Sequence, residues 1–347
     1  MAFTHLTTMA WWLNCGWIRR ADTVPLVLFE GHDPFLNHAI EETILDTAGT
    51  RGPTLAFWRN APCVVIGRHQ NPWIECDLPR MRQDGVHLLR RVSGGGTVFH
   101  DLGNTNFAFI AATGDYDQQR QFSVIIRGLA LLGINATLSP RNDLLVEGRK
   151  ISGNAFRHTR GNSLHHGTLL VTADLGSLGA YLTPPSTDIQ TRSIPSVRSS
   201  VVTLSLGSPG ISHEQVCDAI ARVFCDEYGQ DREDLLPASL DHQAVWRRRA
   251  VLTSWEWQYG MTPLFSRKLG GIPGVGATEL RVRHGIITEM EPGPAALRLA
   301  IAGQRYNSSD LVALAETRDP NTGAALRSIA KELNEWTTNP LEKPGSP

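Results

Sequence analysis

The sequence is poor in cysteine, in net charge and in long apolar runs. Its cysteines number 5 in 347 residues, are scattered and form no C-x-x-C pair, which argues against a disulfide scaffold or a thiolate zinc site and favours a reducing compartment. Lys and Arg total 33 against 34 Asp and Glu, so no overall field exists to hold nucleic acid or an anionic membrane. No stretch approaches the roughly 18 consecutive apolar residues of a membrane-spanning helix.

The rest of the composition is that of a packed globular protein. Hydrophobic residues make up 41% of the chain, with 9 Trp and 11 Phe, while charged residues make up 19%. Such a chain is neither wholly disordered nor a coiled coil. At about 150 residues per domain, its length indicates roughly two domains. Because the net charge is close to zero, any anionic ligand must be bound by a local arrangement of groups.

The two ends of the chain differ from the rest. Residues 1–25 contain no acidic residue before Asp22 but include Arg19 and Arg20, a composition that resembles a mitochondrial transit peptide, with a disordered extension as the alternative. Residues 339–347 contain three prolines and are expected to be a disordered tail. A transit peptide over residues 1–25 would place the protein in the mitochondrial matrix.

Helices and short strands mix without strict alternation, which predicts an α+β fold. Asp33-Pro34 is typical of a helix start, and apolar residues recur with helical spacing up to Gly49. Ser212 and Gln215 form a capping-box pattern ahead of a second helix that ends at Gly229. A further helix is expected over 121–132, and strands are expected over 54–58, 63–66, 86–91, 106–111, 143–146 and 167–171.

A charged and polar stretch over residues 230–250 predicts a linker, with a domain boundary near 245. The expected organisation is a catalytic domain over 26–245 and a small α+β domain over 246–338. In the small domain, strands are expected over 253–259, 279–283 and 285–290, and helices over 310–316 and 326–336.

The most informative segment is Arg90–Asp101, which carries Gly94, Gly95 and Gly96 directly after an apolar strand. Three consecutive glycines let the backbone approach a ligand closely and turn its N–H groups inward. Arg90 and Arg91 add cationic donors, so the segment predicts a phosphate or carboxylate site. A glycine-rich turn with surface arginines is the alternative, and the spacing matches neither a Rossmann nor a P-loop fingerprint.

A second segment, Arg141–Gly153, is typical of a hairpin that turns at Glu147-Gly148. A lysine poised after a tight turn beside a small-residue loop could contact a reacting acyl phosphate, which makes Lys150 the candidate catalytic residue. The alternative is an exposed hairpin lysine without a role.

The pair His165-His166 enters an apolar strand. Adjacent residues of a strand face opposite sides and cannot easily bind one ion, so a structural or hydrogen-bonding role is favoured and no metal site is predicted. The chain has no G-x-S-x-G elbow and no cysteine in its glycine-rich segments. Catalysis by positioning and electrostatics fits this inventory better than a covalent mechanism.

Several separated segments, in matching order and spacing, resemble lipoate-protein ligase A and the mitochondrial lipoyltransferases. The resemblance runs from about Leu26 to at least Phe265. The segments that carry it are Val64–Trp73, Arg90–Asp101, Asn142-Asp143, Lys150–Gly153, His166–Leu170, Ser196–Ser199 and Trp255–Gly260.

The resemblance implies the α+β catalytic fold shared by biotin-protein and lipoate-protein ligases, with mixed sheets and flanking helices, followed by a small mobile lid domain. It implies attack by a lysine of a lipoyl domain on lipoyl-adenylate, with Lys150 stabilising the developing negative charge. The implied lipoyl-adenylate site consists of Arg91, Ser93, Gly94, Gly95, Gly96, Phe99, His100, Arg141, Asn142, Asp143, Lys150, Thr168, Ile194 and Ser196.

The resemblance also implies the partners, namely the apo lipoyl domains of the E2 subunits of 2-oxoacid dehydrogenases and the glycine-cleavage H protein. The protein is expected to act as a monomer. The acyl donor stays open between lipoyl-AMP, lipoyl H protein, and free lipoate with ATP and Mg²⁺. The stretch between Asp143 and Lys150 is shorter than in bacterial ligases and similar to mitochondrial lipoyltransferases, which favours a transferase over a complete ligase.

Other functions remain as alternatives. A biotin-protein ligase is the nearest one, and the Arg90–Gly96 pattern favours lipoate over biotin. A non-catalytic adenylate-binding module would have no use for Lys150. An octanoyltransferase of the same fold would need an acyl-accepting cysteine near the site, and the sequence offers none.

Overall fold

The computed structural model describes residues 23–48, 52–183, 188–197, 199–229, 231–234 and 240–334. The predicted tail over 339–347 and residues 1–22 of the predicted transit segment lie outside these ranges. The chain forms two compact units, each assembled from separate segments. The first unit comprises the described parts of Met1–Asn60, Gly103–Thr172 and Val201–Arg249, and the second comprises those of Ala61–Leu102, Ala173–Ser200 and Ala250–Pro347.

A six-stranded mixed sheet forms the centre of the first unit, in the order β10-β11-β6-β2-β1-β13. Its strands are β1 (Thr23–Leu28), β2 (Thr54–Trp58), β6 (Asn104–Ala112), β10 (Asn154–His158), β11 (Asn162–Leu170) and β13 (Asp231–Asp234). A small sheet of β7 (Thr137–Leu138), β8 (Leu144–Val146) and β9 (Arg149–Ser152) accompanies it. The long β11 pairs antiparallel with both β10 and β6.

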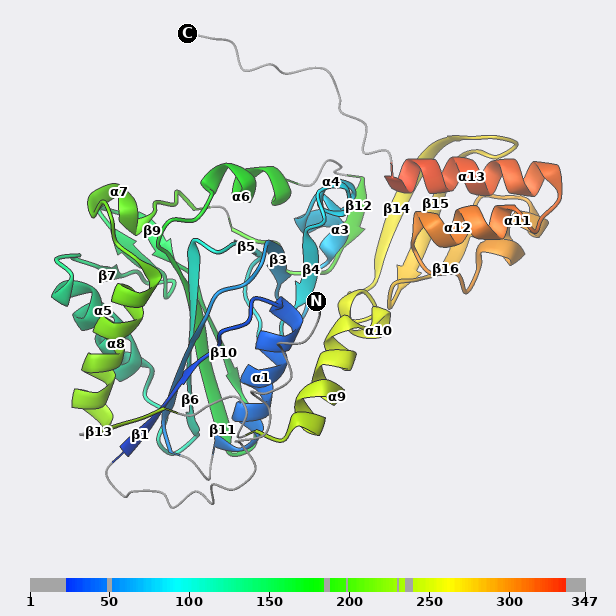
Figure 1. The fold of residues 1–347 in the computed structure, drawn as a ribbon. Coiled ribbons are helices and arrows are strands. Elements are labelled where there is room, and N and C mark those ends of the chain that lie inside the picture. The colour runs from blue at the N-terminus through cyan, green and yellow to red at the C-terminus, as the bar shows by residue number, and fades with distance from the viewer. Residues whose placement is uncertain are drawn as a thin grey trace, which may run out of the picture. The chain divides into compact units, whose positions relative to one another are not determined.

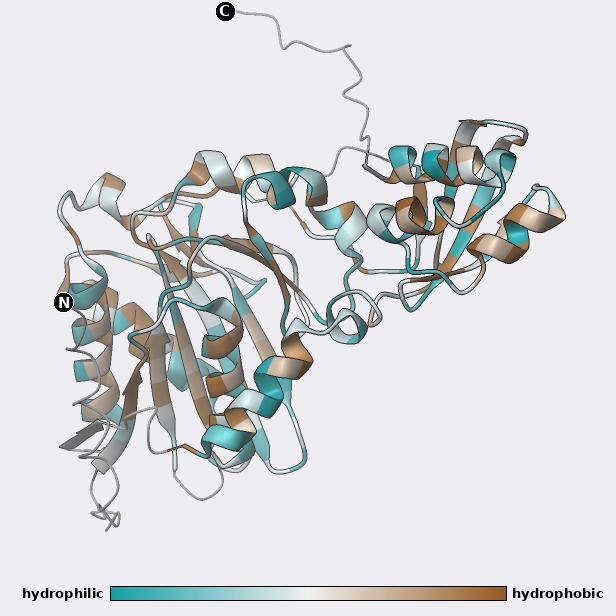
Figure 2. Cartoon of the chain, turned by 45° about the vertical axis from the view of Figure 1, so that its right-hand side comes forward, coloured by the Kyte–Doolittle hydropathy of each residue, from teal (hydrophilic) through white to brown (hydrophobic). Residues whose placement is uncertain are grey.

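Helices cover both faces of this sheet (Figure 1). They are α1 (Pro34–Asp46), α5 (Gln118–Leu131), α7 (Leu204–Gly207) and α8 (His213–Tyr228). The core contains Phe107, Phe109, Phe122 and Phe224 and joins the sheet to α5 and α8. Figure 2 shows hydrophobic residues along the strands and alternating hydropathy on the helices, as expected for helices with one buried face.

The helix starts predicted from the sequence are confirmed. The Asp33 side chain accepts hydrogen bonds from Phe35 N and Leu36 N, with Pro34 in the first turn. The capping box of Ser212 and Gln215 is present at the start of α8. Side-chain oxygens that accept from free backbone N–H groups fix both starts.

The second unit contains two sheets around a second core. One has the order β4-β3-β5, and the other has the order β12-β14-β15-β16. The strands are β3 (Cys63–Ile66), β4 (His87–Arg90), β5 (Val98–His100), β12 (Ile189–Thr191), β14 (Phe265–Ile272), β15 (Gly276–Arg283) and β16 (Ile286–Glu291). Val64 and Phe99 share one hydrophobic cluster with Phe265 and Leu280, so segments far apart in the sequence pack together.

The helices of the second unit are α3 (Pro72–Glu75), α4 (Leu78–Gln83), α6 (Leu175–Tyr181), α10 (Trp255–Gln258), α11 (Ala295–Ile301), α12 (Ser308–Ala315) and α13 (Pro320–Asn334). Helix α9 (His242–Thr253) carries the boundary between the units, which falls after Arg249. In the part of the chain that the structure describes, no helix combines the length and apolarity needed to span a bilayer.

One expectation is wrong. The stretch 253–259 is not a strand, because Ser254 caps the short helix α10 by accepting from Trp257 N. Within the predicted linker over 230–250, residues 242–250 belong to helix α9. The α+β class and most predicted elements are confirmed, whereas the assignment of residues 246–338 as a lid stays a prediction.

Candidate functional site

The β8–β9 hairpin presents the candidate catalytic lysine in the first unit. Glu147 and Gly148 both have positive φ, of 50° and 74°, which produces the tight turn that the sequence predicts. Lys150 Nζ lies 2.8 Å from Asp143 Oδ1 across the hairpin, and both side chains are partly buried. This ion pair holds the ammonium group in one place instead of leaving it free in solvent.

The neighbourhood of Lys150 brings together residues from three segments. A Cβ atom on Gly153 would lie 3.1 Å from Lys150 Nζ and 4.0 Å from Thr168 Oγ1. Gly153 N donates to Thr168 Oγ1 at 3.2 Å, and Asn154 Nδ2 donates to Asn142 O at 2.8 Å. Only a residue without a side chain at 153 leaves the space between the ammonium and the hydroxyl open.

The structure thus gathers Asn142, Asp143, Lys150 and Thr168, which we call the lysine cluster. The fifth predicted residue of the first unit, Arg141, is exposed, and its backbone N–H donates to Ser139 Oγ at 3.2 Å. The cluster offers one fixed cation, one carboxylate and one hydroxyl. Such a set can bind the oxygens of a carbonyl and a phosphate.

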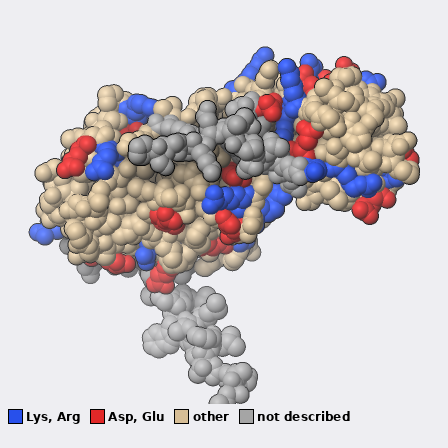
Figure 3. Space-filling model, turned by 90° about the horizontal axis from the view of Figure 1, so that it is seen from above, with Lys and Arg blue, Asp and Glu red and all other residues tan. Residues whose placement is uncertain are grey.

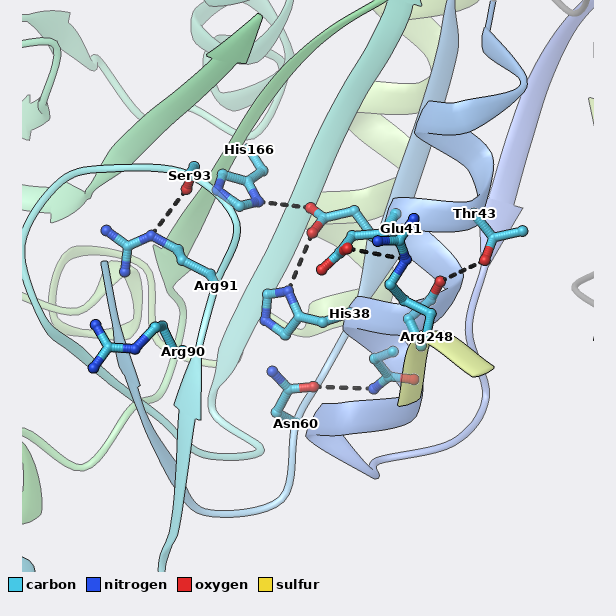
Figure 4. A network of polar contacts seen from close by, with 12 residues as sticks. His38, Glu41, Thr43, Asn60, Arg90, Arg91, Ser93, His166 and Arg248 are labelled. Atoms are coloured by element: carbon cyan, nitrogen blue, oxygen red, sulfur yellow. Dashed lines mark hydrogen bonds and ion pairs between the residues drawn. The ribbon is translucent and has the colours of Figure 1, made fainter. Parts of the chain in front are cut away.

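Residues 93–96, which we call the glycine loop, lie in the second unit and are shaped by the nearby Arg91. Arg91 is 6% exposed, and its Nη2 donates to Gly94 O at 2.6 Å and to Gly96 O at 2.7 Å. Its Nε donates to Ser93 Oγ at 3.0 Å, as Figure 4 shows. The guanidinium therefore turns the loop carbonyls towards itself, and this leaves the loop N–H groups to face elsewhere.

Two glycines of this region are fixed by conformation and contact. Gly95 has a φ of 89°, a conformation that side chains rarely adopt. A Cβ atom on Gly67 would lie 2.2 Å from Gly95 O, so only glycine fits beneath the loop. At Gly94, in contrast, a Cβ atom would meet nothing within 4 Å.

Arg90 does not supply a cationic donor to a ligand, contrary to the interpretation from the sequence. It is 0% exposed, and it donates to Gln70 O at 2.7 Å, Gln258 O at 2.9 Å and Thr262 Oγ1 at 2.9 Å. Burial lowers the pKa of its guanidinium to about 10. Arg90 joins the loop before α3 to the segment after α10.

A loop residue distant in sequence, Ser196, is fastened to the end of the glycine loop. Its Oγ accepts from Thr97 N at 2.8 Å and from Gln70 Nε2 at 2.9 Å. The buried Glu75 carboxylate accepts from both Ser196 N and Ser196 Oγ. Gln70, Glu75 and Thr97 were not identified as site residues from the sequence, because each acts on another protein group and shows no pattern of its own.

The remaining predicted residues of the second unit divide into buried and exposed positions. Phe99 and His100 are buried on β5, and Phe99 packs on Tyr181 with ring centroids 5.3 Å apart. Ile194 is 74% exposed, and its neighbour Val197 is 60% exposed. Arg198, the third residue of that motif, lies outside the described residues.

A buried polar cluster in the first unit, seen in Figure 4, was not predicted. Glu41 of α1 accepts from His166 Nδ1 at 2.6 Å and from His38 Nδ1 at 3.1 Å. Burial alone would raise the pKa of the Glu41 carboxyl, but the facing His166 and His38 lower it to about 2. We call His38, Glu41 and His166 the histidine cluster.

These three residues could also hold a metal ion, since their ligand atoms lie within 4.8 Å of one another. His166 Nδ1 and Glu41 Oε1 are only 2.6 Å apart, however, which is a hydrogen-bond distance, whereas two ligand atoms about 2.0 Å from a tetrahedral zinc ion lie about 3.3 Å apart.

His165 lies on the opposite face of β11, as the alternation of a strand requires. It packs against Phe109 and Phe156, and its ring nitrogens contact Gln121 Oε1 and Asn154 Oδ1. Burial lowers the pKa of its imidazole to about 3, so it is neutral at physiological pH. The side chains of His165 and His166 therefore lie on opposite faces of β11, as predicted.

Figure 3 shows Lys and Arg interspersed with Asp and Glu over the face that it presents, in keeping with the formal net charge of -1.

Comparison with known proteins identifies the family. Residues 33–225, more than half of the chain, match the model of the lipoyl protein ligase A/B catalytic domain. The structure is similar to that of LipL1 from P. falciparum in complex with lipoate, at 25% identity and a TM-score of 0.62, covering 90% of this chain and 99% of LipL1. It is also similar to lipoate-protein ligase A bound with ATP, at 26% identity and a TM-score of 0.58, covering 68% and 98%.

A third similar structure is that of the bi-partite lipoate protein ligase of Thermoplasma acidophilum, determined in a study with its E2 lipoyl domain. The two share 25% identity and a TM-score of 0.57, over 68% of this chain and 95% of the relative. Together with the family match, these likenesses confirm the fold and the resemblance seen in the motifs. The chain belongs to the lipoyl protein ligase A/B catalytic domain family and is a lipoate-protein ligase family enzyme of protein lipoylation.

Proposed function

We propose that the protein is a lipoyltransferase that attaches the lipoyl group of lipoyl-AMP to the specific lysine of lipoyl domains. The observation that carries this proposal is the lysine cluster, in which the Asp143 carboxylate holds Lys150 Nζ and Gly153 leaves room for it beside Thr168. An ammonium fixed in advance stabilises negative charge that develops on a carbonyl oxygen without further reorganisation.

The reaction is an acyl transfer from a mixed anhydride. The uncharged amine of the acceptor lysine attacks the acyl carbonyl, an amide bond forms, and the bond to the phosphate oxygen breaks to release AMP and a proton. Lys150 interacts with the carbonyl and phosphate oxygens during this step. No residue of the chain needs to form a covalent intermediate, and this fits the absence of a nucleophilic motif.

The glycine loop is the second element of the proposal. Arg91 engages the carbonyls of Gly94 and Gly96, and the small residues leave the backbone accessible. Backbone N–H groups of such a loop can bind a phosphate of one nucleotide. A site for ATP with Mg²⁺ must bind three phosphate groups and a metal ion, whereas a site for lipoyl-AMP must bind only one phosphate group.

A complete lipoate-protein ligase is the second candidate, and the likeness to lipoate-protein ligase A bound with ATP favours it. The short hairpin between Asp143 and Lys150 favours the transferase, because it removes backbone beside the lysine cluster. The donor can also be lipoyl H protein. For acceptors we propose apo lipoyl domains of E2 subunits and the H protein, supported by the relative studied with its E2 lipoyl domain.

To identify the acyl donor, purified protein is incubated with apo lipoyl domain and each donor separately, and transfer of the lipoyl group is measured. We expect efficient transfer from lipoyl-AMP and little from free lipoate with ATP and Mg²⁺. Pyrophosphate release from lipoate and ATP, measured without an acceptor, isolates the activation step. A release rate comparable with the transfer rate would overturn the transferase assignment and make the protein a complete ligase.

The mitochondrial matrix is our proposal for where the protein acts, and the composition of residues 1–25 supports it. Import of the full chain into isolated mitochondria, followed by N-terminal sequencing, tests it. Loss of a segment within the first residues is the expected result, and an uncut chain outside the organelle would contradict the proposal.

A further inference from the structure

The residue that precedes Asp143 in the lysine cluster has an unusual backbone conformation. Asn142 has a φ of 62°, in the left-handed region that residues other than glycine seldom adopt. Its backbone N–H donates to Ser139 O at 3.0 Å, and its side-chain Oδ1 accepts from Gln118 Nε2 at 3.2 Å. The backbone of Asn142 sets the direction in which the chain continues, so whatever holds Asn142 also sets where Asp143 meets Lys150.

Asn154 of β10 holds the backbone carbonyl group of Asn142. Its Nδ2 donates to Asn142 O at 2.8 Å and to Ser152 Oγ at 3.2 Å. A carbonyl oxygen can only accept a hydrogen bond, so the Asn154 amide has its nitrogen on this side and its oxygen on the other. Gly167 lies opposite Asn154 on β11, and a Cβ atom there would lie 2.6 Å from Asn154 Oδ1. Only glycine at 167 leaves room for this oxygen.

The oxygen of the Asn154 amide faces His165, with 2.9 Å between Oδ1 and His165 Nε2. His165 is 0% exposed, and burial lowers the pKa of its imidazole to about 3, so the neutral ring carries one hydrogen. Because Asn154 Oδ1 only accepts, that hydrogen lies on Nε2. Nδ1 is then an acceptor, and Gln121, whose side-chain amide contacts it at 3.0 Å, donates to it through the amide nitrogen.

A chain of contacts therefore runs from the core of the first unit to the candidate catalytic lysine. His165 donates to Asn154, and Asn154 donates to Asn142 O. The next residue, Asp143, binds the ammonium group of Lys150. Phenylalanine rings of the core pack against His165, so one end of the chain is closely packed, whereas the other end is a partly exposed side chain.

We propose that Asn154 is a positioning residue for the acyl transfer, because it links the closely packed His165 to the backbone of Asn142 and so sets where Lys150 Nζ lies. This inference rests on the proposed function, since it assumes that Lys150 contacts the reacting acyl group. Asn154 acts through other residues and not on the ligand. A shift of about 1 Å in a catalytic group can lower a rate by on the order of 10²-fold, so a small displacement is enough to be measured.

The test measures single-turnover transfer from saturating lipoyl-AMP to apo lipoyl domain for Asn154→Ala, alone and combined with Lys150→Ala. We expect Asn154→Ala to lower the rate about 10-fold, because Asn142 O loses its donor and the lysine cluster shifts. In the Lys150→Ala background, the same substitution should change the residual rate by less than about 2-fold, because the group that Asn154 positions is already missing. A merely structural role would lower the rate by the same factor in both backgrounds.

Substitutions of His165 test the other end of the Asn154 amide. His165→Phe keeps an aromatic ring in the core but removes the hydrogen on Nε2, and it should lower the rate about 3-fold. His165→Gln retains a donor and should recover part of this loss. In the wild type, the NMR signals of the ring nitrogens should show the hydrogen of His165 on Nε2.

Asn162→Ala is the matched control. Asn162 Nδ2 also donates to a backbone carbonyl, Leu45 O at 2.7 Å, but from the end of β11 that lies away from Thr168. This variant should leave the transfer rate unchanged even if it lowers the melting temperature. Melting temperatures show which variants are folded, and Asn154→Ser, whose single hydroxyl cannot bridge both partners, replaces Asn154→Ala if that variant is not.

Three results would overturn the inference: a wild-type rate in folded Asn154→Ala, an equal fold-decrease in the Lys150→Ala background, or the hydrogen of His165 on Nδ1. If the wild type binds lipoyl-AMP but transfers nothing, the proposed function fails by itself. The affinity for lipoyl-AMP then replaces the rate in the same comparison, and equal effects of Asn154→Ala in both backgrounds would overturn the inference too. Absence of both transfer and binding would overturn both.

Discussion

The lysine cluster and the glycine loop use charge in opposite ways. In the lysine cluster, Lys150 and Asp143 form a partly exposed ion pair that a ligand can reach. Around the glycine loop, Arg90 and Glu75 are buried, and both charged side chains form hydrogen bonds with other groups of the protein. The first arrangement places a reactive side chain, whereas the second fixes a backbone shape.

This difference teaches where mutations should act. Removing a charge from the lysine cluster should change the rate of reaction and leave the fold unchanged, because the pair is partly hydrated. Removing a buried charge around the glycine loop should change the shape of the loop, because the remaining partner is left unpaired in the protein interior.

The largest effect is expected for Lys150→Ala. One preorganised donor to a developing oxyanion contributes about 3 to 4 kcal/mol to lowering the barrier, so the transfer rate should fall by a factor on the order of 10² to 10³. Single-turnover transfer from lipoyl-AMP to apo lipoyl domain measures it. Lys150→Arg should rescue poorly, because a planar guanidinium places its charge differently. A variant with a near wild-type rate would refute the assigned role.

Acid should destabilise the first unit through His165. The pKa of His165 is about 3 in the folded chain and 6.5 in the reference state, because burial disfavours the charged ring. Between these values the unfolded chain binds more protons, so the free energy of unfolding falls as the pH decreases from 6.5 towards 3, by a few kcal/mol in all. Urea unfolding at pH 7 and pH 5 should show this fall.

The same measurement on His165→Gln should show a smaller difference between the two pH values, although this variant starts less stable. His158→Gln, at an exposed position, is the control and should behave like the wild type. Equal pH dependence of His165→Gln and wild type would show that burial does not lower the pKa of His165 in the folded chain.

At the glycine loop, Gly94→Val separates ligand approach from folding. A side chain at Gly94 would meet no atom within 4 Å, so the melting temperature should stay near that of the wild type. The affinity for lipoyl-AMP should fall at least about tenfold, because the side chain occupies space that the ligand needs. Gly179→Val, an equally open glycine on α6, is the control. Undiminished affinity would mean that the glycines serve only a turn.

The smallest effect is expected for Ser196→Ala, which removes the hydroxyl that joins Gln70, Glu75 and Thr97. Loss of these hydrogen bonds should weaken lipoyl-AMP binding several-fold, about 1 kcal/mol. Ser193→Ala, nearby in the same loop, should have little effect. If Ser196→Ala binds lipoyl-AMP as tightly as the wild type does, the hydrogen bonds of Ser196 Oγ do not shape the glycine loop.

Local patterns predicted what depends on neighbours in sequence. The start of α1 at Asp33, the capping box of α8 and the hairpin that presents Lys150 all follow from residues within a few positions of one another. The same reasoning failed at residues 253–259, where a strand was expected. Contacts of Trp257 with Arg90, which lies 167 residues earlier, accompany a helix there instead.

Long-range partners account for the rest. Nothing in the sequence near Arg90 shows that its guanidinium meets Gln258 and Thr262, so it was interpreted as a ligand donor. Glu75 and Gln70 meet Ser196 across more than 120 residues. The histidine cluster was missed because His38 and Glu41 occupy one turn of a helix that looked simply amphipathic.

Transfer of the lipoyl group itself is the most direct test of the account. The mass of an apo lipoyl domain is measured after incubation with lipoyl-AMP and wild-type protein, with Lys150→Ala in a parallel reaction. The account predicts one lipoyl group on the acceptor's target lysine with the wild type and almost none with Lys150→Ala in the same time. An unmodified acceptor, together with intact binding of lipoyl-AMP by the wild type, would contradict it and identify an adenylate-binding protein without transferase activity.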